Sequence, residues 1–235
     1  MTRVFTLLAA SMIAIGSASV ASDGVLPRYQ TNLGTITLEV PRGYVPLSQI
    51  DRVKFDKSRA SLDESIPTIE IMMSAEDWRA MREHDAPARD DLVYLSLLPG
   101  SKPATDESWN NLRKMLLSAI EGGQMDEAPE GVAPRSRFVE GGDASLLENF
   151  VDGRAYVVNT GDDEVRWVIR RNMESQLDDG DEMHPVLYTF AWIRKGPQAM
   201  MLRSSRRLTS ESDAVDAERR FSVFVSAIRF DERIY

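Results

Sequence analysis

The sequence predicts an α+β fold in which one twisted antiparallel sheet has amphipathic helices packed on it. Two hairpin-like segments, 155–169 and 186–203, each hold two strand-like stretches around a short turn, which favours antiparallel pairing. Two amphipathic helices, over 106–121 and 211–228, need an apolar surface, and one face of that sheet is the nearest. No linker or internal repeat divides residues 22–235, so we expect a single domain there.

The first 21 residues have the layout of a secretory signal peptide. Arg3 is followed by an apolar stretch from Val4 to Ile15, and small residues continue to Ala21, after which we place the cleavage. Cleavage after Ala18 is a second option. The alternative is a transmembrane anchor, but roughly 12 apolar residues are fewer than the ~20 that span a bilayer. We therefore expect a periplasmic or secreted protein with no stable membrane insertion after cleavage.

Short strands and one short helix are predicted in the first half of the remaining chain. Three segments alternate or concentrate apolar side chains between turn formers: 36–40, 68–73 and 92–98. Ser74 and Asp77 have the spacing of a capping box, which predicts a helix over 75–83. Residues 22–35 are polar and rich in turn formers, so we expect a loose entry there.

The two longer helices are marked by their ends. Thr105 is a favourable N-cap with acidic residues after it, and Gly122-Gly123 is a favourable stop. Ser210 and Asp213 form a second capping box. The apolar residues of the last helix fall on one face: Ala214, Ala217, Phe221, Phe224, Val225 and Ile228. Residues 121–134 combine acids, Pro and Gly, and predict an exposed loop.

Composition narrows the classes of function. The 235 residues include 28 Lys plus Arg against 37 Asp plus Glu, a formal net charge of −9, and no cysteine. The acidic balance disfavours nucleic acid and anionic lipid as partners, because both attract basic surfaces. Without cysteine there is no disulfide, Cys-ligated metal, thiol nucleophile or lipid attached at the cleavage site. We expect no cofactor and no metal.

One segment resembles a known family. Residues 36–44 (ITLEVPRGY) run from a strand into a turn made of Pro, Gly and an aromatic residue. With a helix before a run of antiparallel strands and an amphipathic helix at 211–228, this layout resembles the PsbP-like superfamily, which includes DcrB-like periplasmic proteins. The resemblance implies an α+β fold and a binding or assembly role without a catalytic centre.

Few residues point to catalysis. His84 stands between two acids at a predicted helix end, and His184 follows an acidic loop, but neither has the spacing of a metal-binding motif. The sequence contains no nucleophile elbow, phosphate-binding loop or dinucleotide fingerprint. We interpret both histidines as surface residues. The alternative is a hydrolase site assembled from scattered side chains.

Arginines gather on the predicted strands of the second half. Arg166 and Arg170 share one face of their strand, and Arg194 and Arg203 lie on the second hairpin. We name these four as candidate partner-binding residues, because a guanidinium can pair with two carboxylate or phosphate oxygens at once. An acidic ligand or protein partner would suit such a groove. The alternative is that they pair with neighbouring acids of this chain.

Aromatic residues alternate along the same strands. Tyr188, Phe190 and Trp192 share a face, and Trp167 points away from the arginines of its strand. We expect these rings to belong to the core, with a ligand pocket as the alternative.

The favoured function is an exported, non-catalytic binding or assembly protein of the bacterial envelope with a protein partner. Periplasmic immunity and inhibitor proteins belong to this class. A hydrolase, or a carrier that holds a small molecule or lipid on the aromatic face, is the alternative.

Overall fold

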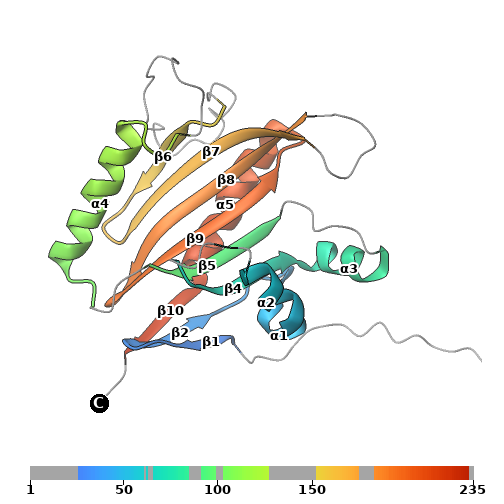
Figure 1. The fold of residues 1–235 in the computed structure, drawn as a ribbon, viewed down its shortest axis with the longest axis horizontal. Coiled ribbons are helices and arrows are strands. Elements are labelled where there is room, and N and C mark those ends of the chain that lie inside the picture. Colours follow the sequence, from blue (N-terminus) through green and yellow to red (C-terminus); the bar gives the residue numbers. More distant parts are fainter. Residues whose placement is uncertain are drawn as a thin grey trace, which may run out of the picture.

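The computed structural model describes residues 26–60, 62, 66–84, 91–98, 103–126, 152–174 and 183–232. The predicted signal peptide at 1–21 and most of the predicted loop at 121–134 lie outside these residues. The described residues form one large sheet, one small sheet and five helices (Figure 1). The α+β class predicted from the sequence is confirmed.

The large sheet has seven strands in the order β3-β4-β5-β9-β8-β7-β6, and every neighbouring pair is antiparallel. Its strands are β3 Tyr44–Pro46, β4 Thr68–Ser74, β5 Leu92–Leu97, β6 Ala155–Thr160, β7 Glu164–Glu174, β8 Met183–Lys195 and β9 Gln198–Arg207. Strands β6 to β9 are neighbours in sequence order, so both predicted hairpins are confirmed. Gly196 turns the second hairpin at a φ of 56°, a conformation that suits glycine.

A small three-stranded sheet joins distant parts of the sequence. Its central strand β2 (Gly34–Leu38) pairs with β1 (Arg28–Gln30) and with β10 (Ile228–Glu232). Ile228 stands opposite Leu38 in this pairing. The expectation of a loose entry over 22–35 is wrong at β1, because a strand of three residues is too short to show periodicity.

A buried carboxylate connects the small sheet to the large one. Glu70 of β4 is 0% exposed, and its Oε2 accepts a hydrogen bond of 2.5 Å from the hydroxyl of Tyr29 in β1. The hydroxyl of Ser48 also donates to Oε2, and the backbone N–H groups of Ser48 and Ile71 donate to Oε1 at 3.1 and 2.9 Å. Burial and the nearby carboxylate raise the pKa of Tyr29. Four donors thus compensate the buried charge.

Five helices complete the described structure. They are α1 Leu47–Ile50, α2 Arg52–Ala60, α3 Ala75–His84, α4 Asp106–Glu121 and α5 Glu211–Ala227. The caps of α3, α4 and α5 lie where the sequence predicts them. Ser74 Oγ accepts from the N–H of Asp77 at 3.0 Å, Thr105 Oγ1 accepts from Ser108 at 3.2 Å, and the capping box at Ser210 is complete.

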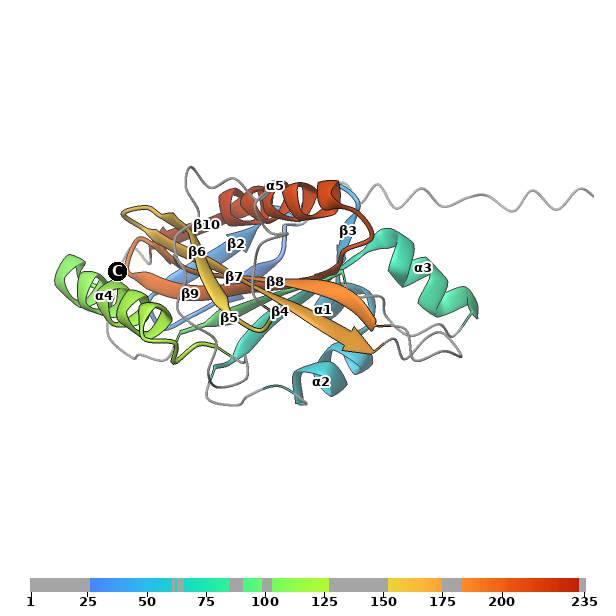
Figure 2. The same ribbon diagram turned by 90° about the horizontal axis from the view of Figure 1, so that it is seen from above.

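The two long helices lie on opposite faces of the large sheet (Figure 2). Helix α5 packs Phe221 and Phe224 into one core cluster with Leu202 of β9, whereas α4 packs Leu116 and Ile120 against Trp167 of β7. The expectation that both helices share one face is wrong. Successive residues of β7 point to opposite faces, and this strand is apolar at consecutive positions, so both faces need a cover.

We call these surfaces the α5 face and the α4 face. On the α4 face, helix α4 lies over the β6–β7 edge, while α1 and α2 pack near β4 through Leu47 and Phe55 (Figure 1). Between them lie β5, β9 and β8, and on this face none of the described helices covers these strands. None of the helices within the described ranges has the length and apolar character needed to cross a bilayer.

Candidate binding surfaces

Arg166 belongs to β7, and its side chain lies between that strand and α5. It is 7% exposed, and its guanidinium bonds Glu164 at 2.5 Å, Glu218 at 3.1 Å and the hydroxyl of Ser222 at 2.7 Å. The same guanidinium stands 5.1 Å from the ring centre of Phe221. Arg166 therefore follows the alternative given above, pairing with acids of its own chain and fixing α5 to the sheet.

Glu218 is the α5 partner in this contact. Its carboxylate also accepts a hydrogen bond of 3.2 Å from the hydroxyl of Thr189 in β8. Burial raises the pKa of Glu218 above its ordinary value, although the charge of Arg166 opposes that change. A buried ion pair of this kind is costly to break from one side only.

Arg194 attaches a helix to the sheet on the α4 face, as Arg166 does on the α5 face. Its guanidinium bonds Asp106 at 2.6 Å and Asp163 at 2.7 Å, and lies 5.9 Å from the ring centre of Trp109. Trp109 Nε1 donates a 2.6 Å hydrogen bond to the carbonyl oxygen of Asp162. These contacts attach the start of α4 to the turn between β6 and β7.

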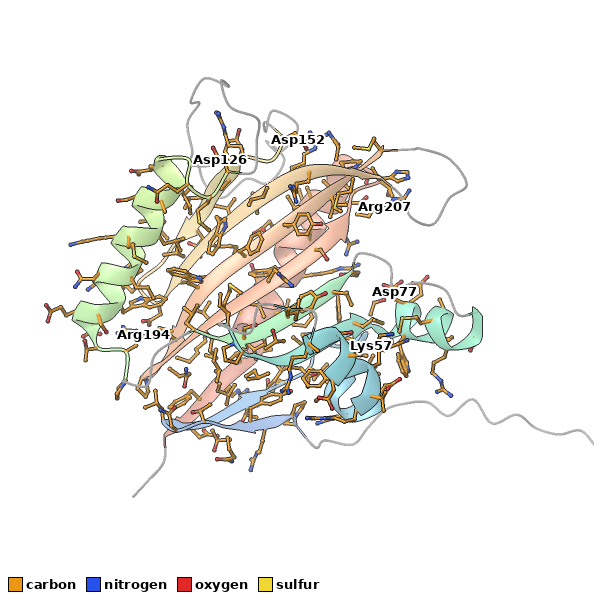
Figure 3. All side chains as sticks on the ribbon, viewed as in Figure 1. Lys57, Asp77, Asp126, Asp152, Arg194 and Arg207 are labelled. Carbon is orange, nitrogen blue, oxygen red and sulfur yellow. The ribbon has the colours of Figure 1, made fainter. Side chains whose placement is uncertain are left out.

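The other end of α4 is fixed as well. Asp126, just after the helix, accepts a 3.0 Å hydrogen bond from the N–H of Ala155, and its Oδ2 lies 3.6 Å from Nε of Arg154. Figure 3 shows Arg194 near the start of α4 and Asp126 near its end. The helix is thus held at both ends, which gives the α4 face a defined wall.

The remaining two candidate arginines are half-buried and lie on different faces. Arg170 shares the α5 face with Arg166, whereas Arg203 shares the α4 face with Arg194, so the four do not form one groove. Within the described part of the chain, neither Arg170 nor Arg203 forms an ion pair with an acid. Arg203 instead places its guanidinium 4.3 Å from the ring centre of Tyr94.

Aromatic rings continue this row across the sheet. Arg203 pairs in register with Tyr94 on one side and Phe190 on the other, and Phe190 pairs with Trp167. The rings of Phe190 and Trp167 stack at 5.2 Å, and Trp192 meets Trp167 edge-on at 6.1 Å. Trp167 is 2% exposed, as expected for a core residue, while Tyr188, Phe190 and Trp192 are half-buried.

The strands beneath this row are basic. β5, β8 and β9 contain no Asp or Glu, whereas β8 and β9 carry six basic side chains. These are His184, Arg194, Lys195, Arg203, Arg206 and Arg207. Arg207 contacts His184 at the opposite end of the strands from Arg194 (Figure 3). Strand alternation places His184, Arg194, Arg203 and Arg207 on the α4 face, whereas Lys195 and Arg206 lie on the α5 face.

On the α5 face, Asp91 collects a separate polar network. The hydroxyl of Tyr44 donates to Asp91 at 3.0 Å, and Arg206 and Arg220 lie 3.7 and 3.6 Å from the same carboxylate. Burial, with the negative charge of Asp91 as the next cause, raises the pKa of Tyr44 to about 12. Arg206 of β9 therefore pairs with an acid of this chain, as Arg166 and Arg194 do.

A pocket of about 680 Å³ lies where the start of α4 meets the β8–β9 turn. Its lining is mainly apolar and includes Leu33, Ile66, Leu98, Pro103, Ala104, Thr105, Ser108, Trp109, Leu112, Trp192, Pro197, Gln198 and Ala199. Trp192 connects this pocket to the aromatic row. No sequence motif marks the pocket, because its lining comes from short segments far apart in the chain.

The histidines do not assemble a site among the described residues. The side chain of His84 lies outside them, and His184 is half-buried beside Arg207. The described residues contain no group of three or more His, Asp or Glu side chains that could hold a metal ion.

Comparison with solved structures finds only distant likeness to known proteins. The sequence matches no known family model and no curated protein. Among solved structures, the Ran-binding protein Mog1p of Saccharomyces cerevisiae is 13% identical with a TM-score of 0.36, over 87% of this chain and 95% of that one. This TM-score is too low to establish a shared fold, so the architecture described above rests on its own strand pairing and packing.

Proposed function

We propose that this protein is an exported, non-catalytic binding protein whose α4 face holds an acidic segment of a protein partner against Arg203. The observation that carries this proposal is the position of Arg203. It is half-buried on strands without acidic residues, stacks on Tyr94, and has no ion pair within the described structure.

The stacking orders the guanidinium before a partner arrives. A cation over an aromatic ring gains about 0.5–1 kcal/mol at partly exposed sites, and the ring limits its motion. The N–H groups along the edge of a stacked guanidinium stay available to a carboxylate, which can accept two of them. Half-buried Tyr188, Phe190 and Trp192 add the aromatic area that protein interfaces use as energetic centres.

Charge complementarity indicates that the partner contacts this surface with an acidic group. A carboxylate close to Arg203 meets no acidic side chain on β5, β8 or β9. Arg194 and Arg166 already neutralise acids of this chain, and Arg170 lies on the opposite face from the aromatic row, so Arg203 is the favoured contact among the four arginines named from the sequence. An acidic loop or chain end with a neighbouring apolar residue fits this surface.

Two features of the sequence support the cellular setting. The layout of residues 1–21 supports export to the periplasm or beyond. The resemblance of residues 36–44 to PsbP-like and DcrB-like proteins supports membership of that group and a binding or assembly role in the bacterial envelope. The absence of catalytic motifs from the sequence agrees with a non-catalytic role.

The test compares Arg203→Glu with Arg170→Glu. Both replace a half-buried strand arginine that has no ion pair in the described structure, but on opposite faces of the sheet. The wild-type protein, purified without residues 1–21, is used to capture proteins from its own envelope fraction, and each captured protein is then titrated in pure form.

We expect a partner that binds the wild-type protein and Arg170→Glu alike, loses at least about tenfold in affinity for Arg203→Glu, and binds more weakly as salt rises. Circular dichroism and thermal unfolding verify that both variants are folded. The proposal is wrong if every confirmed partner binds Arg203→Glu as tightly as the wild-type protein.

A further inference from the structure

The pocket beside the start of α4 belongs to the same face of the sheet as Arg203. Its lining includes Ala199 of β9 and Trp192 of β8, and Trp192 meets Trp167 edge-on at 6.1 Å. Trp167 stacks on Phe190, which pairs in register with Arg203. The aromatic row therefore connects Arg203 to the pocket.

Strand β9 fixes the spacing between these two features. Ala199, Met201 and Arg203 alternate with buried residues that face α5, so all three point to the α4 face. A strand rises about 3.3 Å per residue, which places Arg203 about 13 Å along β9 from Ala199 at the pocket. A cation without an ion pair in the described structure and an apolar pocket thus stand at a defined separation.

The residues between these two features carry no charge. Met201 is half-buried and pairs in register with Trp192 on one side and with Ser96 of β5 on the other. The hydroxyl of Ser96 is hydrogen-bonded to that of Thr68 at 3.0 Å. A segment that crosses this stretch therefore needs no charged side chain between its two contacts.

The pocket suits an apolar side chain. Its volume of about 680 Å³ lies inside the range of about 300–1,000 Å³ that is usual for ligand sites, and none of its described lining residues is charged. Leu112 and Trp109 belong to its walls, and Trp109 is held by its hydrogen bond to Asp162. A backbone hydrogen bond of 2.8 Å joins Ala104 to Pro197. These bonds order the walls before a partner arrives, which lowers the entropy lost on binding.

We propose that the partner of the Arg203 surface binds through an extended segment that places a carboxylate on Arg203 and a large apolar side chain, four residues away, in the pocket. This inference rests on the function proposed above and specifies the sequence of the partner. In an extended chain, side chains four residues apart point the same way and are separated by about 13 Å. A helical segment needs about nine residues for the same distance. The spacing of the acidic and the apolar residue in the partner is therefore diagnostic.

Random peptides displayed on phage are the first probe. They have about twelve residues, which is long enough for either spacing. The wild-type protein without residues 1–21 selects the peptides that bind. We expect the selected peptides to be enriched in Asp or Glu together with Trp, Phe, Leu or Ile, at a separation of about three to five positions in either direction.

The best selected peptide is then titrated by isothermal calorimetry in three forms. One is unchanged, one has its acid replaced by the amide, and one has its apolar residue replaced by serine. With the wild-type protein, each replacement should weaken binding about tenfold. With Arg203→Met, the acid and the amide should bind alike, because the cation that distinguishes them is gone.

Two variants of α4 test the pocket. Leu112→Gln makes a pocket wall polar without much change in size, whereas Met115→Gln makes a comparable change at a side chain that is 58% exposed and outside the lining. We expect Leu112→Gln to bind the unchanged peptide about fivefold more weakly and Met115→Gln to bind it like the wild-type protein. Thermal midpoints verify that both variants are folded, and the peptide replacements test the same contact on the unaltered protein.

The inference is overturned if no peptide is enriched, if acidic and apolar residues are enriched without this separation, or if Leu112→Gln binds the peptide as tightly as Met115→Gln. An effect of Arg203→Met without an effect of Leu112→Gln would remove the pocket contact and leave the proposed function standing. A selected peptide that binds Arg203→Met as tightly as the wild-type protein would count against the proposed function itself.

Discussion

Arg166 on the α5 face and Arg203 on the α4 face of the large sheet differ in how their charge is matched. On the α5 face, the buried Arg166 is matched by Glu164 and Glu218, and Asp91 is matched by Arg206 and Arg220. On the α4 face, Arg203 has a ring beneath it and no acid beside it among the described residues. An arginine that pairs with acids of its own chain contributes to stability, whereas an arginine without such an acid can bind an acid of a partner.

The difference in burial between Phe221 on the α5 face and Phe190 on the α4 face provides the largest expected effect. Phe221→Ala should lower the free energy of unfolding by about 3–5 kcal/mol, because this ring is fully buried between α5 and the sheet. Phe190→Ala on the α4 face should lower the free energy of unfolding by clearly less, since the Phe190 side chain is only half-buried. Urea unfolding of both variants measures the difference, and equal losses would remove the contrast between the faces.

The buried arginine should give the next largest effect. Arg166→Met leaves Glu164 and Glu218 without their cation, and we expect a loss of about 3 kcal/mol at neutral pH. Adding Glu218→Gln to this variant should restore part of the loss, because the second change removes one uncompensated charge. If the double variant is less stable than Arg166→Met alone, the ion pair is not the cause.

Glu218 should make a smaller, pH-dependent contribution. Because burial raises its pKa in the folded protein, the folded state holds a proton that the unfolded state releases from about its ordinary value of 4.5 upward. Stability from this group is therefore present at low pH and is lost as pH rises from 4.5 through the raised pKa. Glu218→Gln removes this contribution, so its free energy of unfolding should fall less steeply above pH 4.5.

The measurement is denaturant unfolding of both proteins at a series of pH values. The difference between the two curves isolates Glu218, because all other titrating groups are shared. Parallel curves from pH 4.5 upward would contradict the assignment of a raised pKa to Glu218.

Arg203 should give the smallest change in stability. Arg203→Met removes a cation stacked on Tyr94 and leaves no acid behind, so we expect a loss within about 1 kcal/mol. Thermal unfolding beside Arg166→Met tests this contrast between the faces directly. A loss as large as that of Arg166→Met would mean that Arg203 has a structural role.

Local signals made much of the fold predictable. The caps at Ser74, Thr105 and Ser210 act over three or four residues, and the helices begin where these signals place them. The hairpins around 159–163 and at Gly196 were likewise visible in their turn residues. Strand β10 was not, because its pairing with β2 depends on residues far away in the sequence.

The candidate site was predictable only in part. Strand alternation places Arg166 and Arg170 on one face and Trp167 on the other, and the structure confirms this. Strand alternation does not say which helix covers which face, so the burial of Arg166 beneath α5 could not be predicted. The pocket could not be predicted either, since Gln198 and the other lining residues follow no local sequence pattern and come together only in the folded chain.

The pairing of β2 with β10 sets a condition on the order of folding. Across this pairing, the hydroxyl of Thr37 donates a 3.5 Å hydrogen bond to Asp231, although 194 positions separate the two residues in the chain. Ile36 and Leu38, which belong to the same core cluster as α5, cannot reach their final neighbours while a ribosome still holds the later segment. Completing this core is therefore a late, non-local step in folding, because contacts between segments far apart in the chain form slowly.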